Sequence, residues 1–129
     1  MRLLDFSDGF TSASPPTTGS LFVTTGTSSS PTSITAVGGI SPGGNAWEVK
    51  YIQGSGGAMD ITANPQIAVG TTASQLLILV GCHDTNTVLL EDGTGLALNG
   101  SCLLVKDSIL VLLWDNTGSK WKEVARNDV

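Results

Sequence analysis

Short apolar runs separated by turn-forming residues dominate the chain from Trp47 onward. Leu, Ile, Val and aromatic residues fill the runs, and Gly, Asn, Asp and Ser fill the gaps, which is typical of strands joined by tight turns. We expect no helix, and eight strands at 47–53, 58–63, 74–81, 86–91, 95–99, 102–106, 108–114 and 120–125. Strands of this length and spacing predict an all-β fold, an antiparallel sandwich or barrel.

The stretch TNTVLLEDGTGLALNG (85–100) illustrates the turn chemistry. Asp and Asn tolerate left-handed backbone and cap their own peptides, while Gly accepts positive φ without a steric penalty. We therefore expect a hairpin tip at EDGTG (91–95) and another turn at Asp115–Gly118.

Two strands are apolar on both sides. In WEVKYIQ (47–53) apolar and polar residues partly alternate, which predicts one solvent-exposed face. LLILV (76–80) and ILVLLW (109–114) contain only apolar residues. A single core in a small antiparallel domain covers only one side of such strands. The second side is therefore predicted to be buried by other copies of the chain. The predicted contacts between copies are Leu77, Leu79, Leu110 and Leu112.

The first third of the chain has a different composition. No charged residue occurs between Gly9 and Trp47, and Ser, Thr, Gly and Pro predominate. Such a segment cannot hold a helix and has little apolar surface to bury. Residues 1–45 are predicted to be an extended arm that orders against a partner, with a disordered leader as the alternative, and residues 46–129 to be the β-domain. The predicted partner-binding residues of the arm are Phe6, Phe10, Leu21, Phe22 and Val23.

Length and charge exclude several classes of protein. The 129 residues suffice for one domain, and the net charge of −5 with six scattered Lys and Arg residues leaves no basic surface for a phosphate backbone. No apolar run approaches the roughly 18 residues of a membrane helix. We expect a soluble protein without an export signal, bound to neither nucleic acid nor membrane, whose Cys82 and Cys102 are reduced rather than bridged.

Candidate catalytic residues are few. The chain has one His and one Tyr, and the side chains of Cys82 and His83, being adjacent, point to opposite faces of a strand. They cannot form a Cys-His pair within one chain. We expect no catalytic residue, no cofactor and no metal. One alternative is a metal ion shared by symmetry-related copies of His83.

Three other patterns favour structure over binding. Asp84, Glu91 and Asp92 could bind calcium, but they lack the spacing of an EF-hand loop, so a solvated hairpin tip is preferred. GSGGAMD (54–60) has neither the lysine of a phosphate loop nor a following helix. The three tryptophans, Trp47, Trp114 and Trp121, are predicted to be core or interface anchors. The alternative is that they stack on sugar rings.

Residues 61–128 resemble β-structured modules in virion proteins of tailed bacteriophages. The likeness rests on an Asn-Pro-Gln-Ile strand (64–67), a Thr-Val-x-Leu-x-Asp-Gly-x-Gly-Leu hairpin (87–96) and a terminal Trp-x-Glu strand (121–123). The sequence departs from the pattern at Ala73-Ser74-Gln75, where a Gly often precedes the Gln. The pattern consists of turns and aliphatic strands, so it indicates the fold more specifically than the function.

The resemblance implies a homotrimeric, non-enzymatic virion protein. A compact trimer with an uncharged arm is similar to capsid decoration (cement) proteins, whose partner is the major capsid protein of the same virion. Such a protein is made in the host cytoplasm and sits on the capsid surface. The alternative is a short tail-fibre, spike or head-fibre component that recognises a host surface. A long fibre is disfavoured because the sequence shows neither a repeat nor a heptad.

Overall fold

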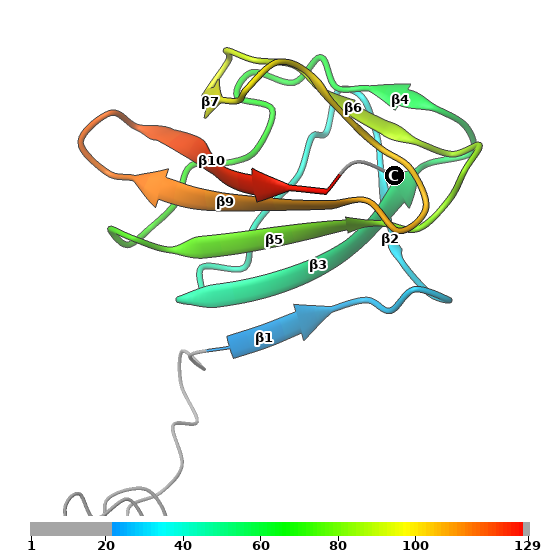
Figure 1. The fold of residues 1–129 in the computed structure, drawn as a ribbon, viewed down its shortest axis with the longest axis horizontal. Coiled ribbons are helices and arrows are strands. Elements are labelled where there is room, and N and C mark those ends of the chain that lie inside the picture. The colour runs from blue at the N-terminus through cyan, green and yellow to red at the C-terminus, as the bar shows by residue number, and fades with distance from the viewer. Residues whose placement is uncertain (1–21, 128–129) are drawn as a thin grey trace, which may run out of the picture.

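The computed structural model describes residues 22–127 (Figure 1). These residues form ten strands and no helix, which confirms the predicted all-β fold. Each of the eight strands predicted after residue 46 is present, most with shorter ends. The strands are β1 (Phe22–Thr25), β2 (Thr32–Ile34), β3 (Trp47–Gly54), β4 (Met59–Asp60), β5 (Leu76–Gly81), β6 (Val88–Leu90), β7 (Leu96–Ala97), β8 (Cys102–Leu104), β9 (Ile109–Asp115) and β10 (Lys120–Arg126).

Two sheets share one core. The larger sheet has the order β1-β3-β5-β9-β10-β7, with β2 paired to the second half of β3, and the smaller sheet has the order β4-β6-β8. Antiparallel pairing was predicted, but it holds only for β5 with β9, β9 with β10 and β6 with β8. The other five pairings are parallel, so the prediction of an antiparallel architecture is wrong for most of the sheet.

The parallel pairs arise because the chain winds in a solenoid-like coil. Trp47 of β3 pairs with Leu76 of β5, and Met59 of β4 pairs with Val88 of β6, so each sheet advances by the same 29 positions per coil. A parallel bridge between Ile40 and Ile67 continues the stacking outside the named strands. The backbone thus repeats its path from coil to coil, although the amino-acid sequence shows no corresponding repeat.

The core contains residues of both sheets and of the first third of the chain. Ile34 and Ile40 are only 3% and 1% exposed, and β1 and β2 both pair with β3. The part of the predicted arm from Phe22 to residue 45 therefore belongs to the β-domain, and the boundary at residue 46 is wrong. Phe22 and Val23 lie in β1, whereas Phe6, Phe10 and Leu21 lie outside the described residues.

β3 alternates as predicted, but its first half buries the polar residues and turns the apolar ones outward. Glu48 and Lys50 are 2% and 8% exposed, while Trp47 is 55% exposed. The buried Glu48 carboxylate accepts hydrogen bonds from the Gly43 amide (2.6 Å) and the Thr25 hydroxyl (2.9 Å). Its Oε2 also lies 3.9 Å from Lys50 Nζ. These partners compensate the desolvation of the charges, so a polar pair can occupy the inside of the first coil.

Gly81 lies where β5 passes closest to another backbone segment. A Cβ added there would lie 2.1 Å from the carbonyl oxygen of Val105, a contact that only a backbone shift can relieve. We expect Gly81→Ala to destabilise the protein by roughly 1–3 kcal/mol, measured by urea unfolding. Gly57→Ala is the matched control, because a Cβ at Gly57 meets nothing within 4 Å. Equal midpoints for the two variants would contradict this packing.

Candidate functional site

The larger sheet carries apolar side chains on the face turned away from the core. Alternate residues of β3, β5 and β9 are buried, and the residues between them are half-buried or exposed. We call the apolar members of this second set, with Phe22 of β1, the outer apolar face. Its members are Phe22, Trp47, Val49, Tyr51, Leu76, Ile78, Val80, Ile109, Val111 and Leu113.

Strand register arranges these side chains in three rows across the sheet. Residues directly opposite each other in a ladder share one face. The first row runs Phe22-Trp47-Leu76-Leu113, the second Val49-Ile78-Val111 and the third Tyr51-Val80-Ile109. A charged pair borders the first row, where Lys122 lies opposite Leu113 and its Nζ is 3.0 Å from Asp115 Oδ2.

The outer apolar face is large for a surface exposed to water. Four strands, β1, β3, β5 and β9, lie side by side in the lower layer of Figure 1. Three rows about 6.6 Å apart on three strands about 4.8 Å apart, with Phe22 added from β1, give the face an area of roughly 300 Å² in projection. Isolated soluble chains rarely expose larger continuous apolar patches, and patches of this size often mark interaction sites.

The predicted contact residues lie on the opposite side of the same strands. Leu77 is 1% exposed, and Leu79, Leu110 and Leu112 are fully buried, all within a single chain. They are core residues, so their assignment to an interface between copies is wrong. Both sides of β5 and β9 are apolar, and a shift of one residue exchanges the two sides of a strand. The sequence therefore held no signal that could choose between them.

His83 stabilises a turn. Its Nδ1 accepts hydrogen bonds from the backbone amides of Thr85 (3.0 Å) and Asn86 (2.9 Å). The adjacent Cys82 is half-buried, and this burial raises the pKa of its thiol. A protonated thiol is a poor nucleophile. The geometry thus gives each residue a structural environment, and Cys82 and Cys102 are both thiols.

The stretch at 91–95 forms a tight turn, as predicted, but the predicted hairpin is wrong, because β6 before the turn and β7 after it belong to different sheets. Gly93 and Leu96 exchange backbone hydrogen bonds, and Gly93, Thr94 and Gly95 all have positive φ. Asp92 Oδ1 accepts a hydrogen bond from the Leu98 amide (2.8 Å). Within residues 22–127, no three His, Cys, Asp or Glu side chains converge to hold a metal ion.

The three tryptophans have two different environments. The rings of Trp114 and Trp121 pack in the core with centroids 5.3 Å apart, and the Trp121 indole N–H donates to the Ala68 carbonyl (3.0 Å). Trp47 is instead exposed in the first row of the outer apolar face. Two tryptophans are therefore core anchors, and only Trp47 is available to a partner.

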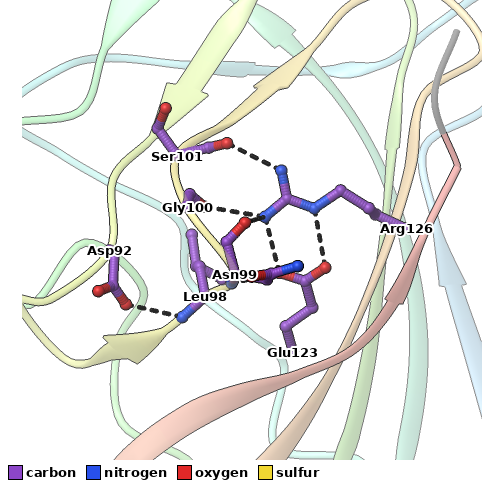
Figure 2. A network of polar contacts seen from close by, with 7 residues as sticks. All are labelled: Asp92, Leu98, Asn99, Gly100, Ser101, Glu123 and Arg126. Atoms are coloured by element: carbon purple, nitrogen blue, oxygen red, sulfur yellow. Dashed lines mark hydrogen bonds and ion pairs between the residues drawn. The ribbon is translucent and has the colours of Figure 1, made fainter.

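A polar network at the end of β10 holds the loop after β7 (Figure 2). The Arg126 guanidinium donates to both carboxylate oxygens of Glu123, at 2.8 and 2.7 Å. It also donates to the carbonyls of Asn99 (3.2 Å), Gly100 (2.9 Å) and Ser101 (2.8 Å). This clamp could not be predicted from the sequence, because every residue has a backbone carbonyl and the residue types do not show which carbonyls Arg126 contacts.

Arg126 lowers the pKa of Glu123, and the hydrogen bond from the Asn99 amide lowers it further. A carboxylate with a lowered folded-state pKa stabilises the fold above its unfolded value, near 4.5, and this stabilisation is lost as the pH falls through the folded pKa. We therefore expect acidification from about pH 6 to about pH 3 to destabilise the wild type more than Glu123→Gln. Urea midpoints at both pH values test this, with the exposed Glu91→Gln as control. Identical losses in all three proteins would rule the clamp out as an acid-labile element.

Comparisons with known proteins add no relative. No family model, curated protein or solved structure matches the chain. Within the described part of the chain, no helix is long and apolar enough to span a membrane. The fold and site together define an all-β, solenoid-like protein with an apolar sheet face.

Proposed function

We propose that the protein is a structural virion protein of a tailed bacteriophage, a homotrimeric decoration (cement) protein of the head shell. The outer apolar face is the observation that supports self-association. The likeness of residues 61–128 to phage virion modules supports the virion assignment. The proposed partners are other copies of the chain and the major capsid protein, and the proposed location is the capsid surface.

Self-association follows from the cost of leaving the outer apolar face in water. Each Å² of apolar surface removed from water contributes about 25 cal/mol. Three copies that turn this face toward a common axis would enclose a second, shared core, and a rotational ring leaves no face uncovered. A trimer therefore accounts for strands that are apolar on both sides.

A structural role rather than catalysis fits the polar groups. Cys82 is held as a neutral thiol by burial, and His83 and Asp92 accept hydrogen bonds from backbone amides. These groups organise turns, whereas an enzyme needs a nucleophile, a base and an electrostatic stabiliser that converge on one substrate. We propose that the protein has no enzymatic activity and needs no cofactor or metal.

Attachment to the shell is proposed to use residues 1–21, which include Phe6, Phe10 and Leu21. Strand addition would supply affinity through backbone hydrogen bonds without charge. Removal of residues 1–21 is expected to leave the β-domain folded and to abolish co-sedimentation with purified shells. Removal of residues 1–45 is expected to unfold the domain as well, because it deletes the buried Ile34 and Ile40. Shell binding that survived the shorter deletion would contradict this route of attachment.

A fibre or spike component remains the second candidate, and the solenoid-like coil favours it. Stacked coils can extend along one axis, which removes the objection that the sequence contains no repeat. Copy number distinguishes the two functions, since a shell protein is present in hundreds of copies per virion and a fibre in few. Binding to host envelopes instead of shells would favour the second candidate.

A further inference from the structure

We propose that Trp47 of one copy inserts into a groove at the opposite end of the outer apolar face of the next copy. This inference rests on the proposed self-association and specifies its geometry. The contact is head-to-tail: each chain contributes an aromatic projection at the start of β3 and a groove at the end of β3.

The aromatic projection consists of two neighbouring side chains. Phe22 and Trp47 are opposite each other in the β1–β3 ladder and are 54% and 55% exposed. Both belong to the first row of the outer apolar face. Large aromatic side chains bury about 150–250 Å² each and dominate the energetics of interfaces, so an exposed pair is a strong candidate anchor.

The groove lies in the third row, about 13 Å along β3 from Trp47 at the usual rise per residue. It has a volume of about 540 Å³, and its apolar walls are Tyr51, Val80 and Ile109. Lys106 and Asp107, both exposed, complete one rim. An indole ring seated there would contact the apolar walls, donate its N–H to the Asp107 carboxylate and place a ring face near the Lys106 ammonium.

Strand height makes the two features meet. Consider a threefold axis that is perpendicular to the strands and parallel to the plane of the sheet. Rotation about this axis does not change the position of a strand along the axis, which we call its height. The start of β3 in one copy then faces the end of β3 in the next. The projection lies on β1 and β3 and the groove walls lie on β3, β5 and β9, so the two features overlap in height at β3.

The occupant is a second copy because the contact is continuous with the outer apolar face. A standard interface buries about 800 Å² on each partner. The face supplies roughly 300 Å² in projection, and burial of the two aromatic side chains of the projection adds about 150–250 Å² each. In a ring of three, each chain uses its projection on one neighbour and its groove on the other, which closes without a free end.

Cross-linking tests the seating directly, because the groove contains a native thiol at Cys82. Ala46→Cys adds a thiol at the exposed bend that immediately precedes Trp47, without altering the ring. Treatment of the full-length Ala46→Cys protein with a short bismaleimide is expected to give covalent trimers, and Ala46→Cys combined with Cys82→Ser is expected to give none. Val37→Cys is the matched control, since Val37 is 82% exposed outside the outer apolar face.

Each outcome decides between the inference and the proposed function. Oligomers that fail to cross-link, or whose cross-links persist without Cys82, would overturn the seating of Trp47 and leave self-association standing. A monomeric protein would overturn both. As a second measurement, Trp47→Ala is expected to weaken self-association at least 30-fold, whereas Val37→Ala leaves it unchanged. Equal association constants for the two variants would contradict the anchor role.

Discussion

Leu112→Asp is expected to prevent the chain from folding. Leu112 is fully buried and packs in the shared core of the two sheets. A carboxylate there would lie among apolar core side chains and opposite the Glu123 carboxylate, so the substitution costs several kcal/mol. Domains are stable by only about 5–15 kcal/mol, so a loss of this size removes most or all of the folded population.

The neighbouring residue provides the control. Leu113 lies on the same strand but on the outer apolar face, opposite Leu76. Leu113→Asp is therefore expected to retain a cooperative unfolding transition. Circular dichroism and urea unfolding of both variants measure the difference. Wild-type-like stability of Leu112→Asp would show that the two faces are assigned the wrong way round.

Ile78→Asp is expected to separate the copies while leaving each chain folded. Ile78 lies in the middle row of the outer apolar face, between Val49 and Val111. In a trimer this position is dry, and a carboxylate there opposes association, whereas in a single chain it is half-exposed and tolerable. Light scattering and circular dichroism at micromolar concentration measure the two effects together.

Val37→Asp is the control for that experiment, because it places the same charge at an exposed site outside the face. The control is expected to remain a trimer. If Ile78→Asp were also a trimer, the outer apolar face would not be the contact between copies.

The sequence predicted the strands well because their boundaries are marked locally. Gly and Asp residues end the runs at 91–95 and 115–118, and the structure has turns at both places. The direction of pairing could not be predicted. Trp47 pairs with Leu76 through a complete coil of the chain, and the inward residues of successive coils differ in chemistry, as with Glu48 beside Leu77. Coils that pair in this way therefore show no repeat in their amino-acid sequences.

The sequence predicted that both sides of β5 and β9 are apolar, but not which side faces the core. Apolar residues on both sides of β5 and β9 indicated a surface that needs cover, yet Leu77 and Ile78 are equally apolar, and only tertiary packing decides which is inside. Ile34 and Ile40 were assigned to the arm and not to the core, because the segment around them is rich in Ser, Thr and Gly and has few apolar residues. Their burial depends on contacts far away in sequence, which no local pattern records.

The mass of the full-length protein in solution tests the central claim most directly. Sedimentation equilibrium or light scattering at micromolar concentration measures it without a partner or a label. We predict three times the mass of one chain, because the outer apolar face needs cover that a single chain does not supply. A stable monomer at that concentration would contradict the account.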